Sequence, residues 1–392
     1  MSDRGSGFVQ RTQVAVGVGT IARLPAELDR LGVIRPVVLC DAALVEGPVG
    51  ARIRTLLPHA TIVGRAGGEP SFDSIRDDAR QIELAEADGL VAVGGGSTID
   101  TAKLGRGLLA ARVSDLAMLP DPLPSRPLPF IAVPTTAGTG AEIGSGAIAF
   151  DPRVDDKILV RRPELVADLA IADAELTLSL PANLTAWTGC DALGQALLAY
   201  VPAGWDSVAG QLALRAIKLI VDALPRAVAD GQDLDARRDQ MLGSVLSALA
   251  MFNAPPTYAG EHTFAEPVGA ALHIHHGMAV AQFLAGTVEL NAEVASDRFA
   301  EVARELGLAD QTVPPMEATL VLAARLRALV DEFGIPALRD VAPDADLNVL
   351  AARCARHDGY LLNPRPLDDA ATLAVLEGAW TGTWRANIRA AV

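Results

Sequence analysis

The chain has 392 residues, half of them hydrophobic, and its 48 Asp and Glu residues against 33 Lys and Arg residues give a formal net charge of −15 at pH 7. One hydrophobic core rarely serves more than about 250–300 residues, so the length predicts two domains. So acidic a surface repels phosphate backbones and anionic lipids, which argues against nucleic acid and membranes as partners. It does not exclude a nucleotide cofactor, because backbone amides can hold a phosphate locally.

The sequence also indicates where the protein works. Residues 1–14 lack the apolar segment of a signal peptide, and no uncharged apolar stretch reaches the roughly 18 residues of a spanning helix. The cysteines at 40, 190 and 354 are scattered and form neither a disulfide framework nor a CxxC site. We therefore expect a soluble globular protein of the cytoplasm.

Short Val- and Ile-rich runs alternate with longer helical patterns up to about residue 178. The runs at 36–40, 89–96 and 129–136 are bounded by Gly or Pro, as buried parallel strands are. Residues 71–87, between the first two runs, are charged on one face and predict an amphipathic helix. This order predicts βαβ units and therefore an α/β domain with a parallel sheet.

The strand signal fades in the second half, where apolar residues recur at spacings of three and four. This half predicts an all-α domain, with the break near Pro181. We expect a ligand cleft where two such domains meet.

A glycine-rich turn follows the apolar run at 89–94. Gly94, Gly95, Gly96 and Ser97 lead directly into a helix that carries Asp100 and Lys103 in its first turns. Glycines let a bulky ligand approach the backbone, and a helix N-terminus attracts phosphate. The alternative is a tight structural turn with Ser97 as the helix cap.

A second loop of this kind follows the run at 129–134. It is rich in Gly and Thr, with hydroxyls on Thr135, Thr136 and Thr139. Such a loop can hydrogen-bond phosphate or ribose, although a purely structural turn is also consistent with it. Two such loops in one half-chain favour a nucleotide.

Histidines cluster in the second half of the chain. Four of the six lie within 15 residues: His262, His273, His275 and His276. Neutral imidazole suits Zn, Fe and Ni, so the cluster favours a metal site, although the last three cannot all face one point and some could be solvated. His59 and His357 stand alone and are expected at the surface.

A carboxylate and an amide also share one face of an apolar helix. Asp191 and Gln195 are four residues apart in the segment 188–201. An acid on an apolar face needs a partner, a metal or a cleft. The alternative is that Asp191 caps the start of the helix after Gly189.

Taken together, four segments resemble the iron-containing (group III) alcohol dehydrogenases, which share their fold with dehydroquinate synthase and glycerol dehydrogenase. In order, they are VAVGGGSTIDTAK, PTTAGTGAE, IADAELTLSLPANLTAWTGCDAL and HTFAEPVGAALHIHHGMAVA. The resemblance runs nearly end to end. It implies an α/β dinucleotide-binding domain over 1–178, an all-α metal and substrate domain over 179–392, and a divalent metal in the cleft between them. Members often form dimers, so we expect a homodimer or larger homo-oligomer.

The resemblance assigns cofactor contacts to the first domain. It implies that the pyrophosphate lies against Gly95, Gly96 and Ser97 beside Asp100, and the nicotinamide end against Thr135, Thr136 and Thr139. Lys157 resembles the family lysine near the nicotinamide ribose, and Asp41 the acid that meets the adenosine ribose. A carboxylate at Asp41 accepts the 2′-hydroxyl and repels a 2′-phosphate, so we expect NAD rather than NADP.

The metal site departs from the family pattern of one Asp and three His. Asp191, His262 and His276 match three ligands, but Gln195 replaces the first His. Leu198 replaces a family Glu, and Glu266 replaces a His near the nicotinamide. One outcome is that Fe or Zn binds more weakly, with Gln195 or water completing its shell. The other is a metal-free site in which His262, His273 or His276 polarises the substrate.

The sequence therefore predicts NAD(P)-dependent hydride transfer between C4 of a nicotinamide and a small aldehyde, ketone or alcohol in the interdomain cleft. The catalytic candidates are His262, Glu266, His273 and His276. Glu266 could relay a proton if its surroundings raise its pKa, and it would repel an anionic substrate. The alternatives are a metal-independent enzyme like maleylacetate reductase, a non-redox enzyme like dehydroquinate synthase, and a nucleotide-binding scaffold that has lost catalysis.

Overall fold

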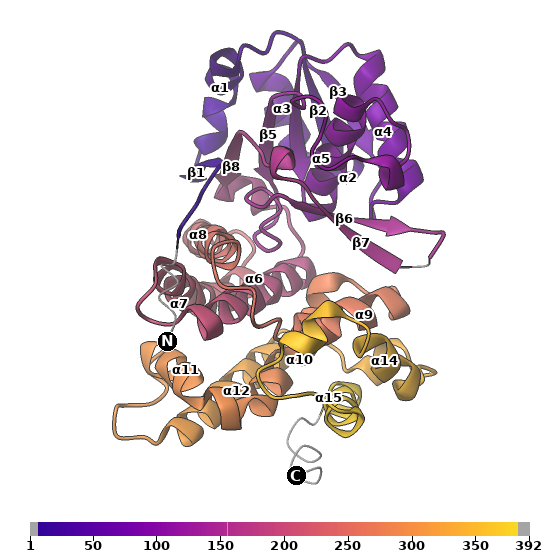
Figure 1. Ribbon diagram of the computed structural model, residues 1–392. Coiled ribbons are helices and arrows are strands. Elements are labelled where there is room, and N and C mark those ends of the chain that lie inside the picture. Colours follow the sequence, from indigo (N-terminus) through magenta and orange to yellow (C-terminus); the bar gives the residue numbers. More distant parts are fainter. Residues whose placement is uncertain (1–6, 155, 383–392) are drawn as a thin grey trace. The chain divides into compact units, whose positions relative to one another are not determined.

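The computed structural model describes residues 7–154 and 156–382. The chain forms two compact units (Figure 1). The sheet unit comprises Gln10–Leu180 and Gly231–Val245. The helical unit comprises Pro181–Asp230, Leu246–Val392 and the N-terminal residues up to Val9.

The sheet unit is built on six parallel strands in the order β1-β8-β5-β4-β2-β3. Their bounds are β1 (Gln13–Gly17), β2 (Pro36–Asp41), β3 (Thr61–Arg65), β4 (Gly89–Gly94), β5 (Phe130–Pro134) and β8 (Leu169–Asp173). A separate antiparallel hairpin consists of β6 (Gly146–Asp151) and β7 (Asp156–Arg161). The parallel sheet predicted from the apolar runs is confirmed.

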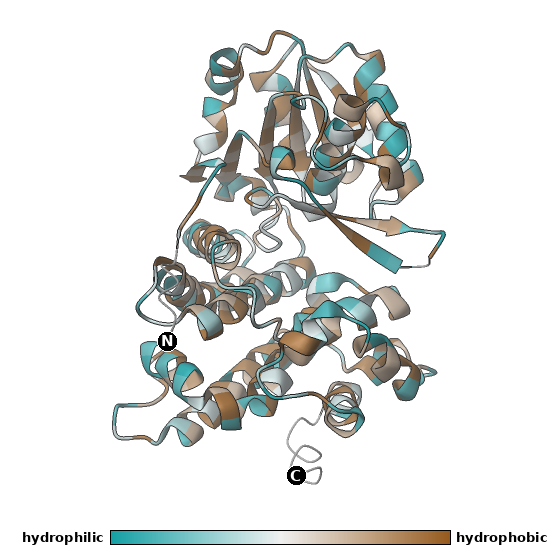
Figure 2. Cartoon of the chain, in the orientation of Figure 1, coloured by the Kyte–Doolittle hydropathy of each residue, from teal (hydrophilic) through white to brown (hydrophobic). Residues whose placement is uncertain are grey.

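Helices cover both faces of this sheet. Side chains at alternate positions of the strands, such as Val91 and Val93, pack with α1 (Leu24–Leu31) and α3 (Pro48–Leu56). Those between them, such as Leu90 and Ala92, pack with α4 (Phe72–Leu84) and α5 (Gly96–Ala111). Because β4, β5 and β8 are buried on both faces, their sequences are apolar rather than alternating, apart from Asp173 at the end of β8 (Figure 2).

The predicted amphipathic helix at 71–87 is α4. Its start is fixed by a reciprocal pair of hydrogen bonds, in which Ser71 Oγ accepts from Ser74 N and Ser74 Oγ accepts from Ser71 N. The short helix α2 (Ala42–Val45) follows β2 directly. The helix α8 (Leu234–Met251) begins in the sheet unit and ends in the helical unit.

The helical unit has no strand among its described residues, and the predicted all-α character is confirmed. Its helices besides the end of α8 are α6 (Ala182–Ala203), α7 (Val208–Ala229), α9 (His262–Leu272), α10 (His276–Leu290), α11 (Ala292–Glu305), α12 (Pro315–Glu332), α13 (Leu338–Val341), α14 (Leu347–Cys354) and α15 (Asp369–Thr381). One apolar core joins them. Within the described part of the chain, no helix has both the length and the apolar character needed to cross a membrane.

Candidate active site

The glycine turn of the sheet unit connects β4 to α5 without a side-chain cap. Gly95 is the residue before the helix, and its extended backbone (φ −75°, ψ −174°) makes the turn. A Cβ on Gly96 would lie 2.7 Å from Thr139 Oγ1, so a side chain at this position displaces the neighbouring loop. The alternative that Ser97 caps the helix is wrong, because Ser97 lies inside its first turn.

The threonine loop lies beside the glycine turn. β4 and β5 are neighbours, and Thr135 N donates to Gly94 O over 3.0 Å. An added Cβ on Gly95 would lie 3.4 Å from the Thr136 methyl group. The structure thus brings both loops together at the carboxyl edge of the sheet, the edge at which open α/β folds bind ligands.

Two side chains of α5 hydrogen-bond to the end of the threonine loop and to β6. Asp100 Oδ2 accepts from Ile148 N over 2.9 Å, and Lys103 Nζ donates to Gly144 O and Gly146 O over 2.8 Å each. Burial raises the pKa of Asp100 to about 6 against the opposing charge of Lys103. Asp100 therefore binds the backbone of β6, which differs from the cofactor contact expected from the sequence.

Asp41 and Lys157 also have partners within the sheet unit. Asp41 lies at the end of β2, next to β4, and its Oδ1 accepts from Ala43 N over 3.0 Å at the start of α2. Lys157 Nζ lies 2.6 Å from Glu69 Oε1 in an ion pair. The partner of Lys157 is thus an acidic side chain 88 positions earlier in the sequence, which no local pattern indicates.

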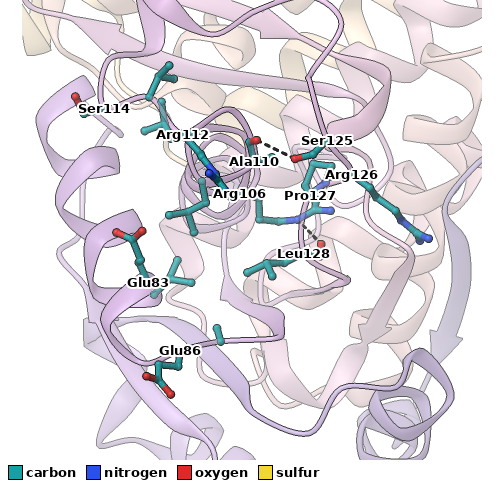
Figure 3. Close-up of a pocket in the computed structure, with 15 residues that line it drawn as sticks. Glu83, Glu86, Arg106, Ala110, Arg112, Ser114, Ser125, Arg126, Pro127 and Leu128 are labelled. Atoms are coloured by element: carbon teal, nitrogen blue, oxygen red, sulfur yellow. Dashed lines mark hydrogen bonds between the residues drawn. The ribbon is translucent and has the colours of Figure 1, made fainter.

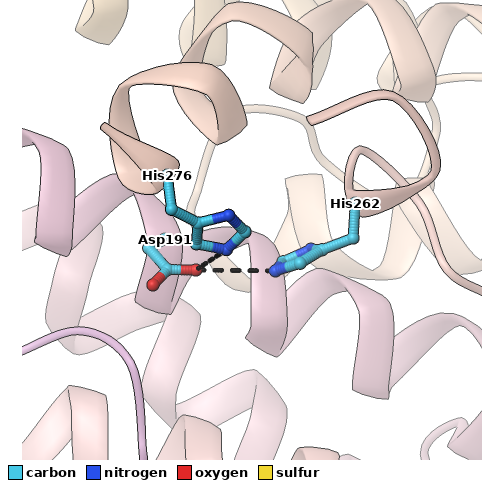
Figure 4. A group of neighbouring side chains, drawn as sticks. All are labelled: Asp191, His262 and His276. Atoms are coloured by element: carbon cyan, nitrogen blue, oxygen red, sulfur yellow. Dashed lines mark ion pairs between the residues drawn. The ribbon is translucent and has the colours of Figure 1, made fainter. Parts of the chain in front are cut away.

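In the helical unit, Asp191, His262 and His276 converge (Figure 4). They come from three helices: Asp191 from α6, and the two histidines from the first residues of α9 and α10. The Nε2 atoms of His262 and His276 lie 3.5 and 3.6 Å from the same oxygen, Asp191 Oδ1. The three potential ligand atoms lie within 4.8 Å of one another. We call these three residues the triad.

A glycine allows one histidine of the triad to reach its position. Gly277 follows His276, and a Cβ on Gly277 would overlap the Trp187 carbonyl of α6. The absence of a side chain therefore lets the start of α10 approach α6 closely. His275 precedes the helix, accepts from Gly277 N through Nδ1 and packs its ring 5.1 Å from that of Trp187.

The predicted ligand Gln195 contacts the triad through Asp191. Gln195 Nε2 donates to Asp191 Oδ1 over 3.1 Å, one turn further along α6. His273 lies outside the triad: it is exposed and ends α9 in the left-handed conformation (φ 51°). His273 is therefore not part of the triad, and its catalytic role stays a prediction.

In the triad, neighbouring charges and hydrogen bonds shift the pKa values in the direction opposite to that of burial. Burial acts to raise the pKa of Asp191, but the charge of His276 and hydrogen bonds with both histidines lower it below its usual range. Burial acts to lower the pKa of His262, but hydrogen bonds to Asp191 and Glu261 raise it well above its usual range. The carboxylates Asp191 and Glu261 therefore outweigh burial and favour a positive charge at this point.

Glu266 lies one turn after His262 on α9 and pairs with His357. Glu266 Oε2 lies 2.7 Å from His357 Nε2, and His357 Nδ1 accepts from Gly359 N over 3.1 Å. Because Nδ1 is an acceptor, Nε2 carries the proton and donates to Glu266. Partial burial acts to raise the pKa of Glu266, but the His357 bond and nearby histidines lower it to about 2.

Two expectations from the sequence are therefore wrong. Glu266 does not meet the condition of a raised pKa, so it is a fixed anion rather than a proton relay. His357 is not a solitary surface residue but a half-buried partner of Glu266. Their sequence separation of 91 leaves no local signal for this pairing.

A separate open pocket of about 840 Å³ lies in the sheet unit (Figure 3). It is lined by the ends of α4 and α5 and by residues just before β5, so it lies at the amino edge of the sheet. None of the predicted site residues lines it. Its buried Arg106 already donates to Leu128 O over 2.8 Å, so this pocket is not the candidate site.

The sheet unit carries a glycine turn and a threonine loop at the carboxyl edge of a parallel sheet, and the helical unit carries a carboxylate–imidazole group. Residues 11–174 match the iron-containing alcohol dehydrogenase family, and residues 185–380 match the Fe-containing alcohol dehydrogenase family, C-terminal. The chain belongs to the iron-containing alcohol dehydrogenase family. The expected NAD(P)-dependent oxidoreductase activity on CH–OH groups is confirmed by this membership.

Individual relatives agree with this assignment. The chain is 32% identical to long-chain-alcohol dehydrogenase 1 of Geobacillus thermodenitrificans, over 94% of this chain and 95% of the relative. It is 30% identical to NAD-dependent methanol dehydrogenase of Bacillus methanolicus, over 82% and 85%. Among solved structures, alcohol dehydrogenase from Oenococcus oeni superposes with a TM-score of 0.86 at 28% identity, covering 96% of this chain and all of the other.

Proposed function

We propose that the chain is an NAD-dependent dehydrogenase for small neutral alcohols and aldehydes, with a divalent cation held by the triad. The observation that carries this proposal is the convergence of Asp191, His262 and His276 within 4.8 Å. One carboxylate and two imidazoles from rigid helices are a donor set that suits Zn and Fe.

The residues of the two units have separate tasks. Gly95, Gly96 and the threonine loop leave room for the NAD pyrophosphate, and the start of α5 offers backbone N–H groups to it. Asp41 favours NAD because its carboxylate accepts a ribose 2′-hydroxyl, in line with the name of the Bacillus methanolicus relative. A cation at the triad would supply Lewis-acid polarisation of a carbonyl oxygen.

Gln195 and Glu266 shape the surroundings of the triad. The Gln195 amide fixes the orientation of Asp191, so that Oδ1 faces both histidines. Glu266 stays anionic, since His357 donates to it. The negative charge favours neutral substrates over carboxylates.

The test is NADH oxidation by the purified chain with a panel of small neutral aldehydes. We expect turnover, and we expect Asp191→Ala to lower kcat/KM at least about a hundredfold, because the cation loses its carboxylate. Asp222→Ala, on the exposed face of α7, is the control and keeps its activity. NAD binding without turnover of any aldehyde would instead favour the nucleotide-binding scaffold.

Two further expectations stay predictions. The family resemblance supports a homodimer or larger homo-oligomer, and the sequence favours a cytoplasmic location. Light scattering of the purified chain tests the first, and fractionation of the producing cells tests the second.

A further inference from the structure

A second buried carboxylate touches the triad and has no role so far. Glu261 directly precedes His262, and only 1% of its surface is exposed. Its Oε1 lies 2.9 Å from His262 Nδ1. The imidazole of His262 therefore lies between two carboxylates, with Nδ1 toward Glu261 and Nε2 toward Asp191.

This arrangement decides which nitrogen is available to a cation. An imidazole that binds a cation through Nε2 carries its remaining proton on Nδ1, and a buried N–H needs an acceptor. Glu261 Oε1 is that acceptor. A hydrogen bond to a carboxylate is stronger than one to a neutral carbonyl, and it holds the ring in one orientation.

The neighbouring helix leaves room for this carboxylate. Gly194 lies on α6 beside Gln195, and a Cβ at Gly194 would overlap Glu261 Oε1. Any other residue at 194 would therefore push Glu261 away from His262. A carboxylate removed from water costs free energy unless it is partnered, and its described partner is the His262 ring.

We infer that Glu261 is a positioning residue of the cation site: it fixes the Nδ1-protonated form of His262 and supplies the second negative charge of the group. With neutral imidazoles, Asp191 and Glu261 together match the charge of one divalent cation. The inference rests on the proposed cation site of the triad.

The first test is the affinity of the full chain for Zn²⁺, measured by competition with a chelator at constant pH. Loss of a group that orients a metal ligand typically weakens affinity about 10- to 100-fold, which is the result expected for Glu261→Ala. Glu261→Gln keeps an acceptor oxygen but no charge, so it should fall between the wild type and Glu261→Ala.

Glu266→Gln is the matched control. It removes the same charge from within α9, the helix that Glu261 directly precedes, but its bond is to His357 and not to His262. Because Glu266 is partly exposed, its loss should weaken Zn²⁺ binding less than about fivefold.

A second variant reaches Glu261 without replacing it. Gly194→Ala displaces the Glu261 carboxylate, so it should weaken Zn²⁺ binding about as much as Glu261→Ala. In the double variant the two effects should not add, because both act through one contact.

The ring of His262 provides a readout besides affinity. In Zn²⁺-loaded protein labelled with ¹⁵N-histidine, we expect a protonated Nδ1 and Zn²⁺ on Nε2 of His262. Glu261→Ala should shift the Nδ1 resonance and speed exchange of its proton with water.

Two results would overturn the inference. If Glu261→Ala keeps wild-type Zn²⁺ affinity and an unchanged His262 resonance, the inference about Glu261 is contradicted, while the proposed cation site of the triad is not. A wild-type chain that binds no Zn²⁺ would contradict both the inference and the proposed cation site.

Discussion

Around the triad, single side chains set the charge and the hydrogen-bond directions. Gln195 donates to Asp191, Glu261 accepts from His262, and His357 donates to Glu266. Only Gln195 could be placed from the sequence, because it lies one helical turn from Asp191. Nothing in the sequence marks Glu261 as buried, and His357 reaches Glu266 through the tertiary fold.

The fixed charge of Glu266 leads to a prediction on substrate choice. Glu266→Gln should raise kcat/KM for succinate semialdehyde relative to butyraldehyde roughly tenfold, because repulsion of the substrate carboxylate disappears. The two aldehydes have the same chain length, so their ratio reports charge. An unchanged ratio would show that Glu266 does not face the substrate.

Asp41 allows a test of cofactor choice that spares the fold. Its Oδ1 caps α2, and an alanine would lose this cap at a cost of about 1 kcal/mol. Asp41→Asn keeps an acceptor oxygen but removes the charge that repels a 2′-phosphate. We expect the ratio of kcat/KM for NADPH to that for NADH to rise about tenfold. A constant ratio would remove Asp41 from the adenosine site.

At the scale of elements, the order of strands and helices was predictable, while the bracing between them was not. Apolar runs bounded by Gly or Pro indicate β2, β4 and β5 because both of their faces are buried. Asp100 and Lys103 bind backbone atoms of β6, and Lys103 also binds the residue Gly144 just before it. These bonds depend on the β6–β7 hairpin, which was not predicted from the sequence. From the sequence, Asp100 was therefore assigned to the cofactor, and Lys103 was left without a role.

The bracing by Asp100 has a consequence for stability. Its pKa of about 6 in the folded chain exceeds the value of about 4 for an unfolded Asp, so the folded state binds this proton more tightly. The stabilisation is complete below about pH 4 and is lost as the pH rises through about 6. Its full size is about 2–3 kcal/mol.

Asp100→Asn tests this consequence, because its amide keeps an oxygen for Ile148 N–H and does not titrate. The Tm of the wild type should fall relative to that of Asp100→Asn between about pH 4 and 7, as measured by scanning fluorimetry. Asp77→Asn, on the exposed face of α4, is the control. A pH-independent difference between the wild type and Asp100→Asn would contradict the assignment.

For the whole molecule, four motifs in one order were enough to predict the family, the parallel sheet and the helical second half. The domain boundary at 178/179 and the individual site roles stay predictions. Long-range pairs such as Lys157 with Glu69 and Glu266 with His357 lay beyond sequence reasoning, because a single sequence does not show which distant side chains meet.

We propose that the triad holds a divalent cation although Gln195 stands where the family resemblance places a histidine. The most direct test is the metal content of the purified chain, measured by inductively coupled plasma mass spectrometry, with NADH oxidation assayed before and after chelation. We predict stoichiometric Fe or Zn, loss of activity on chelation and recovery when the metal is returned. Metal-free protein with undiminished turnover would contradict the claim and place the chain among metal-independent reductases.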